Sequence, residues 1–158
     1  MMIISGGQTG ADQAALDAAI TLGIPHGGWL PKGRKTEAGP LPLRYKLREL
    51  GSSRYRERTE KNILSACGTL IISFGPLAGG SALTEALAIR HGRPFLHIDL
   101  ELIESNQATE IVEQWISSMA LQVINVAGPR ASSEPRIYQA VYSLLTGIRW
   151  PSRLLDRD

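Results

Sequence analysis

The chain has 158 residues, 43% apolar and 20% charged, which predicts one globular domain with a sizeable core. Its single cysteine, Cys67, excludes an internal disulfide and fits a reducing cytoplasm. No apolar run approaches the ~18 residues of a membrane-spanning helix, so we expect no membrane anchor and a cytoplasmic protein.

The formal net charge is only +2, but positive charge is concentrated in one segment. Residues 31–61 hold ten Lys or Arg and four Glu, which gives +6 there and −4 elsewhere. Such a basic segment favours an anionic partner, and a solvated surface segment is the simpler alternative. Nucleic acid is disfavoured as a partner because no aromatic-interleaved or helix-turn-helix pattern is present.

Short apolar runs alternate with helical patterns along the chain. A predicted strand at 2–5 precedes a predicted helix at 11–22, where Thr9 and Asp12 have the spacing of a capping box. A short strand at 24–29 then leads into a long loop that ends near residue 56. Beyond it the pattern predicts helices at 59–66, 83–91, 108–120 and 135–146, and strands at 69–74, 94–98 and 121–126.

This alternation predicts an α/β fold with a doubly wound, mainly parallel sheet and helices on both faces. We expect a single domain over residues 1–150 and a mobile tail over 151–158. Ligands of such sheets bind at the carboxyl ends of the strands, near the point where the strand order reverses.

Three glycine loops each follow a predicted strand. They are the first glycine loop (5–12), the second (75–81) and the third (125–132). A glycine loop between a strand and a helix lets backbone N–H groups face an anion. Because all three loops lie at predicted carboxyl ends of strands, we expect one site for a phosphate-bearing or oxyanionic ligand.

The first glycine loop departs from the standard nucleotide motifs. It has glycines at 6, 7 and 10, which is neither G-x-G-x-x-G nor a P-loop, so standard NAD or ATP binding is disfavoured. Gln8 and Thr9 are candidate hydrogen-bond donors to a ligand. Asp12 either caps the following helix or binds a ribose hydroxyl, an amine or a metal ion.

The second glycine loop brings two glycines together with hydroxyl and carboxylate groups. Gly79 and Gly80 allow close backbone approach, and Ser81 and Thr84 offer hydroxyls. Glu85 is expected in the first helical turn, either as a complement to the helix dipole or as a general base. A branched residue at Gly7 or Gly80 is expected to abolish binding without unfolding the chain.

The third glycine loop places Arg130 beside Gly128, where an arginine can clamp an oxyanion or simply lie on the surface. Trp29 is a candidate for stacking on a planar ring, with core packing as the alternative. The three histidines have no metal-ligand spacing with Cys67 or with one another, so we expect no metal site.

Several ordered motifs resemble the molybdenum carrier family. They are Ile4–Asp12, Gly28–Arg34 with Glu37 and Gly39–Leu41, Tyr55–Thr59 with Asn62, Gly68–Ile71, Gly79–Ser81 with Leu83 and Thr84, and Asn125–Arg130. The resemblance covers residues 2–147 and implies a Rossmann-like fold and a relation to proteins that carry molybdenum cofactor (molybdopterin), a pterin with a phosphate. One departure is Ala66-Cys67, where the family is expected to have Ser-Asp.

The same family is more distantly similar to lysine-decarboxylase-like proteins, some of which are cytokinin-activating phosphoribohydrolases. Their Pro-Gly-Gly-x-Gly-Thr-x-x-Glu motif is only partly matched, because residues 79–85 keep the double glycine and lack the later Gly-Thr. The hydrolase activity is therefore not carried over to this chain.

The leading hypothesis is a protein that binds a phosphorylated heterocycle, either molybdenum cofactor or a nucleotide, and forms a homo-oligomer. Its expected ligand-binding residues are Gly6, Gly7, Gln8, Thr9, Gly10, Asp12, Trp29, Arg34, Gly79, Gly80, Ser81, Thr84, Gly128 and Arg130. The alternative is a nucleotide hydrolase that cleaves an N-glycosidic or phosphate bond with Glu85 or Asp12 as the catalytic carboxylate.

Overall fold

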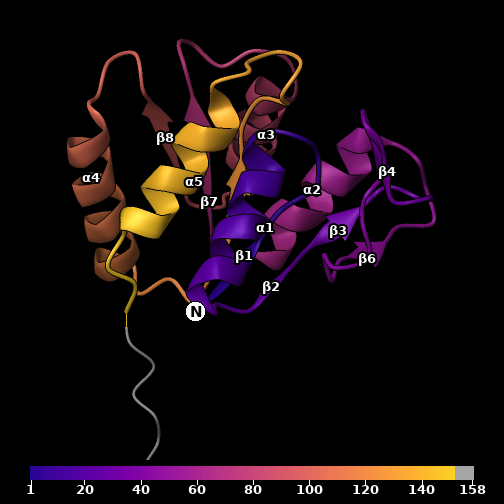
Figure 1. Cartoon of the computed structure of the whole chain (residues 1–158), viewed down its shortest axis with the longest axis horizontal. Coiled ribbons are helices and arrows are strands. Elements are labelled where there is room, and N and C mark those ends of the chain that lie inside the picture. Colours follow the sequence, from indigo (N-terminus) through magenta and orange to yellow (C-terminus); the bar gives the residue numbers. More distant parts are fainter. Residues whose placement is uncertain (152–158) are drawn as a thin grey trace, which may run out of the picture.

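A five-stranded parallel sheet forms the centre of the computed structural model, which describes residues 1–151 (Figure 1). Its strands are β1 (Met2–Ile4), β2 (His26–Gly27), β7 (Gly68–Ser73), β8 (Phe95–Asp99) and β9 (Val123–Ala127), in the order β2-β1-β9-β7-β8. All six residues of β7 are buried, as expected for a strand covered on both faces.

Helices cover both faces of this sheet. Helices α1 (Ala11–Leu22), α4 (Ser105–Ser118) and α5 (Ile137–Gly147) lie together on one face, and α2 (Tyr55–Ser65) and α3 (Gly79–Arg90) lie together on the other (Figure 1). The larger core is formed by the sheet with α1, α4 and α5, and five buried alanines of α1 let that helix approach closely. The predicted doubly wound, Rossmann-like α/β fold is confirmed.

The segment from 24 to 54 is more ordered than the sequence suggests. The single strand expected at 24–29 is divided, because β2 joins the main sheet whereas β3 (Trp29–Leu30) pairs with β6 (Arg48–Glu49). Gly28 makes the break: its φ is 128°, and a Cβ there would lie 2.1 Å from the carbonyl oxygen of Ser5. A second small sheet joins β4 (Lys35–Thr36) to β5 (Gly39–Pro40).

A second, small core anchors this segment to the domain. Leu41 and Tyr45 pack with Leu30 and with Leu16 of α1. Arg34 fixes the loop from within, since its Nε donates to the carbonyl oxygen of Leu41 at 2.8 Å and its Nη2 to those of Pro42 and Tyr45 at 2.9 and 2.8 Å. The segment expected as a long irregular loop is therefore packed against the rest of the domain.

The expected starts of α2 and α3 and the expected cap of α1 are wrong. Helix α2 begins at Tyr55 and not at 59, and α3 begins at Gly79 and not at 83, so Glu85 lies beyond the first turn of α3. Thr9 and Asp12 do not form a capping box, because Gly10 occupies the N-cap position of α1 with a φ of 79° and no side chain caps it. Most of the predicted tail, residues 152–158, lies outside the described residues. Within residues 1–151, no helix has both the length and the apolar character needed to cross a membrane.

Candidate functional site

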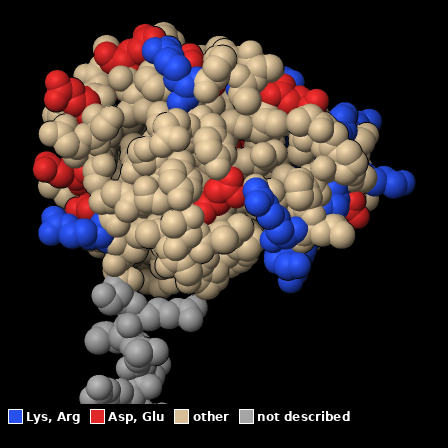
Figure 2. Space-filling view, viewed as in Figure 1, with Lys and Arg blue, Asp and Glu red and all other residues tan. Residues whose placement is uncertain are grey.

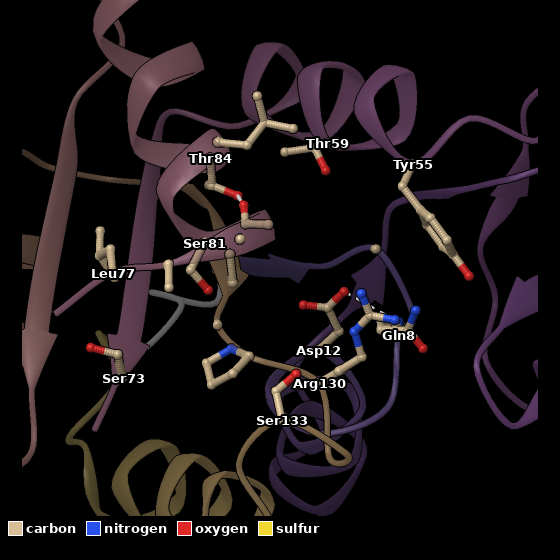
Figure 3. A pocket seen from close by; sticks show the side chains of 18 of the residues that line it. Gln8, Asp12, Tyr55, Thr59, Ser73, Leu77, Ser81, Thr84, Arg130 and Ser133 are labelled. Atoms are coloured by element: carbon tan, nitrogen blue, oxygen red, sulfur yellow. Dashed lines mark hydrogen bonds between the residues drawn. The ribbon is translucent and has the colours of Figure 1, made fainter. Parts of the chain in front are cut away.

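A cavity of about 360 Å³ opens at the carboxyl ends of β1, β7 and β9, between the first residues of α2 and α3 (Figure 3). Its volume is within the range of small-molecule sites, roughly 300–1,000 Å³. It lies where the strand order reverses, which is the usual ligand position in an open parallel sheet. The lining residues are Gly6, Gln8, Asp12, Tyr55, Arg58, Thr59, Asn62, Ser73, Phe74, Pro76 to Ser81, Leu83, Thr84, Asn125 to Arg130, Ser133 and Glu134.

The first and third glycine loops meet at the edge of this cavity. A Cβ on Gly10 would lie 2.6 Å from the carbonyl oxygen of Pro129, and a Cβ on Gly128 would lie 2.5 Å from that of Ile72. The N–H of Ala11 donates to the same Pro129 oxygen at 3.2 Å. Glycine at 10 and 128 is therefore required for loop packing, whatever the ligand.

The start of α3 forms the open wall of the cavity. A Cβ on Gly79 or Gly80 would meet nothing within 4 Å. No acceptor among the described residues pairs with the N–H of either glycine, as is usual for the first residues of a helix. Ser81 is 94% buried, and its Oγ makes no hydrogen bond to a described residue. This wall thus presents two backbone donors and one hydroxyl to the cavity.

An ion pair between α1 and α2 forms the opposite wall. Nη1 of Arg58 lies 2.8 Å from Oδ2 of Asp12, and both side chains are largely buried. The backbone N–H of Gln8 donates to the same Oδ2 at 3.2 Å. Burial raises the pKa of the Asp12 carboxyl above its ordinary value, and the Arg58 guanidinium and the Gln8 N–H only partly offset this effect.

Glu37 ties the segment 31–47 to the first and third glycine loops. Its carboxylate accepts hydrogen bonds from the Thr9 hydroxyl and from both the N–H and the hydroxyl of Ser132. Its own N–H donates to Oε1 of Gln8 at 2.9 Å. Hydrogen bonds from Ser132 and Thr9 lower the pKa of Glu37, so this carboxylate stays ionised and holds the loops together.

Nine of the predicted site residues line the cavity. They are Gly6, Gln8, Asp12, Gly79, Gly80, Ser81, Thr84, Gly128 and Arg130. Figure 3 shows Asp12 and Gln8 on one side, Ser81 and Thr84 on the other, and Arg130 with Ser133 at the lower edge. Loops far apart in the sequence are thus brought to one place.

The remaining predicted residues lie elsewhere. Thr9 and Gly10 serve loop packing, and Glu85 is absent from the cavity lining. The guanidinium of Arg34 is occupied by three carbonyl oxygens of its own loop. The Trp29 ring contacts Arg48 and Lys61 instead of the cavity.

Gly7 also lies outside the cavity lining. A branched residue there was expected to abolish binding without unfolding the chain. The φ of Gly7 is 73°, and a Cβ there would lie 2.8 Å from Cδ2 of Leu41. A branched residue at this position would strain the backbone and press on Leu41 of the small core, so such a substitution would lower stability and would not isolate ligand binding.

One face of α2 lines the cavity, although none of its residues was predicted for the site. Tyr55, Arg58, Thr59 and Asn62 line the cavity and are spaced i, i+3, i+4, i+7, which places them on one side of a helix. That spacing was available in the sequence, but the charged residues between these positions made the segment resemble a solvated surface. Asn62 also holds β3, because its amide group pairs with both the N–H and the carbonyl oxygen of Trp29.

The basic segment lies mostly outside the cavity. Figure 2 shows Lys and Arg side chains gathered over the side of the molecule formed by α2, β3, β4 and β6. Arg58 is the one Lys or Arg of residues 31–61 that lines the cavity. Among the described residues, no cluster of three or more His, Cys, Asp or Glu side chains is placed to hold a metal ion.

The unusual Ala66-Cys67 pair lies at the amino end of β7, whereas the cavity lies at its carboxyl end. Neither residue lines the cavity. A change at these positions therefore has no direct path to ligand choice.

Comparison with known proteins agrees with this geometry. The sequence profile of the circularly permutated YpsA SLOG family matches residues 3–148. The chain belongs to the circularly permutated YpsA SLOG family. It is also similar to the crystal structure of a protein from Syntrophus aciditrophicus SB that is named "Putative molybdenum carrier protein", with 56% sequence identity, 91% of each chain covered and a TM-score of 0.90. No curated protein matches the chain.

The strand order explains the word permutated. In the usual Rossmann sheet the first five strands have the order 3-2-1-4-5. Moving its first strand to the end of the chain and renumbering gives 2-1-5-3-4. This is the order found here when β1, β2, β7, β8 and β9 are counted in sequence. In this member of the SLOG family the central strand is therefore the last one, β9, and the third glycine loop follows it.

Proposed function

We propose that this chain binds a phosphate-bearing small molecule, a phosphorylated heterocycle, in the cavity at the carboxyl edge of the sheet. The observation that carries the proposal is the wall made by the start of α3. Two N–H groups and the Ser81 hydroxyl face open space there, at the positive end of a 12-residue helix. Arg130, half exposed at the lower edge, adds a positive charge.

The ligand has two chemical candidates with the same two parts, a phosphate and a planar heterocycle. The name of the Syntrophus protein supports molybdenum cofactor as one of them. The donors present suit the phosphate of such a cofactor better than a bare cation, since no described cluster of acidic, His or Cys side chains is placed for a metal ion. Gly79, Gly80 and Ser81 would hold the phosphate, and Tyr55 and Thr59 would face the heterocycle. A nucleotide fits the same description.

Binding without turnover is the function that the carboxylates support best. Asp12 and Glu134 are the acidic residues of the cavity lining, and each is paired with an arginine, Arg58 and Arg136 respectively. Glu85, the other carboxylate considered for a hydrolase, is outside the lining. Chromatography of AMP incubated with the protein tests this point: we expect AMP to remain intact. Release of adenine or adenosine that is lost in Asp12→Asn would instead establish the hydrolase alternative.

The proposal predicts a strong dependence on the phosphate. We expect AMP to bind at least about tenfold more tightly than adenosine, because hydrogen bonds to a charged group contribute about 1.5–3 kcal/mol each. Isothermal titration calorimetry with the two compounds at constant ionic strength measures the difference. Equal affinities, or no binding of either AMP or inorganic phosphate, would contradict it. The homo-oligomer stays a prediction, which light scattering can test.

A further inference from the structure

The two oxygens of the Asp12 carboxylate have different hydrogen-bond partners. Oδ2 receives both the Arg58 Nη1 donor, at 2.8 Å, and the Gln8 N–H, at 3.2 Å. The backbone N–H of Gly6 also lowers the pKa of this carboxyl. Oδ1 accepts neither the Arg58 nor the Gln8 hydrogen bond. Because Asp12 lines the cavity, Oδ1 can accept a hydrogen bond from a ligand there.

The two walls of the cavity differ in charge, with the Asp12 carboxylate on one and the positive end of α3 on the other. Asp12 lies across the cavity from Ser81 and the start of α3 (Figure 3). A carboxylate oxygen repels a phosphate, whereas the positive helix end attracts it. An asymmetric ligand would therefore place its phosphate at α3 and a hydrogen-bond donor at Asp12.

The ion pair with Arg58 favours the form of Asp12 that accepts hydrogen bonds. Arg58 packs directly on Gly6, since a Cβ on Gly6 would lie 1.7 Å from Nη1 of Arg58, and this packing fixes the guanidinium. Its charge opposes the effect of burial on the carboxylate and favours the ionised, accepting form. Arg58 is the charged group within ion-pair distance of Asp12. Two other charged residues, Arg130 and Glu134, line the same cavity. Glu37 contacts the first glycine loop through a hydrogen bond from its N–H to Gln8.

We propose that Oδ1 of Asp12 accepts a hydrogen bond from the non-phosphate part of the ligand, from a sugar hydroxyl or a heterocycle N–H, and that Arg58 is the positioning residue for this contact. The inference rests on the proposed function, because the phosphate at α3 places the rest of the ligand toward Asp12. The ligand class is thereby narrowed to phosphate esters that carry an O–H or N–H donor on the side away from the phosphate.

Calorimetric titration of Asp12→Asn tests the contact. The amide oxygen can keep the bonds from Arg58 and Gln8 while its NH₂ group replaces the accepting Oδ1. We expect the affinity for AMP to fall about 10- to 150-fold, the equivalent of one hydrogen bond to a charged group, and the affinity for inorganic phosphate to stay within about twofold. Asp17→Asn, the same charge change one and a half turns further along α1, should leave both affinities unchanged.

The probes separate the two donors and the two proposals. Ribose 5-phosphate carries hydroxyls only, so a loss for both ribose 5-phosphate and AMP assigns the contact to the sugar, and a loss for AMP alone assigns it to the heterocycle. An unchanged AMP affinity in Asp12→Asn would overturn this inference and leave the phosphate site intact. Failure of every probe to bind the unmodified protein would overturn the proposed function, and this inference with it.

Arg58→Met distinguishes positioning from packing. Without the guanidinium, the pKa of Asp12 rises further, so the loss of AMP affinity on acidification should move to higher pH. Calorimetry from pH 5 to pH 8, with thermal unfolding measured on the same samples, provides the readout. A pH profile that keeps its midpoint while the overall stability falls would show that Arg58 only packs.

Discussion

Gly80 offers the clearest separation of ligand binding from folding. A Cβ at this position meets nothing within 4 Å, and its φ lies outside the left-handed region. Gly80→Val therefore adds a branched side chain beside the N–H donors of α3, and its Cβ displaces no neighbour. Valine and glycine differ by only about 0.5 kcal/mol in helix propensity, so the free energy of unfolding should change by no more than that amount.

The effect on binding should be much larger. If the added methyl groups remove one hydrogen bond between an N–H group and a charged phosphate oxygen, AMP affinity falls by about 1.5–3 kcal/mol, or about 10- to 150-fold. Calorimetry measures the affinity, and urea unfolding measures stability. Gly51→Val is the matched control, because its Cβ also meets nothing within 4 Å and Gly51 is absent from the cavity lining. Unchanged AMP affinity in a folded Gly80→Val would refute the assignment of the phosphate to α3.

Three further predictions concern the segment that precedes α2. Gly28→Ala should lower the free energy of unfolding by at least about 1–3 kcal/mol in urea, because its Cβ would lie 2.1 Å from the Ser5 carbonyl oxygen at a φ of 128°; an unchanged unfolding midpoint would contradict this. Arg34→Lys should cost about 2 kcal/mol in the same assay, because a single amine cannot reach all three carbonyl oxygens that Arg34 binds. Burial and the nearby Lys46 lower the pKa of His26, whose Nε2 accepts the Lys46 N–H. The folded state thus favours neutral His26, and this stabilisation is complete above the ordinary pKa of about 6.5 and is lost as the pH falls through the lower folded value. Melting temperatures from pH 7.5 to pH 5 should therefore drop more for the unmodified chain than for His26→Gln; equal drops would count against the shift.

The positions of the glycine loops could be predicted from the sequence because their chemistry is local. Strand β7 is a continuous apolar run, and Gly10, Gly75 and Gly128 mark turns that any other residue would strain or block. Parallel strands bring their carboxyl ends to one edge, so the meeting of the three loops followed from the fold class alone.

The start of α3 and the position of Trp29 depend on tertiary packing and could not be predicted from the sequence. Gly79 and Gly80 have low helix propensity, yet they open α3, because the helix is held by its later buried residues Thr84, Leu87 and Ala88. Gly28 splits an otherwise continuous strand and so turns Trp29 away from the cavity.

Contacts between charged residues far apart in the sequence could not be predicted from the sequence either. Arg58 belongs to a basic run, and only the fold places it beside Asp12, 46 residues earlier. Glu37 reads as an exposed acid, but it joins two glycine loops through Thr9 and Ser132. Such contacts depend on which loops the sheet brings together, and a single sequence does not state that.

A crystal structure of the chain with AMP tests the central claim most directly. We expect the phosphate within hydrogen-bond distance of the N–H groups of Gly79 and Gly80 and of the Ser81 hydroxyl, with the nucleoside extending toward Asp12. A phosphate bound instead on the exposed cations of residues 31–61, with the cavity free of nucleotide, would contradict it.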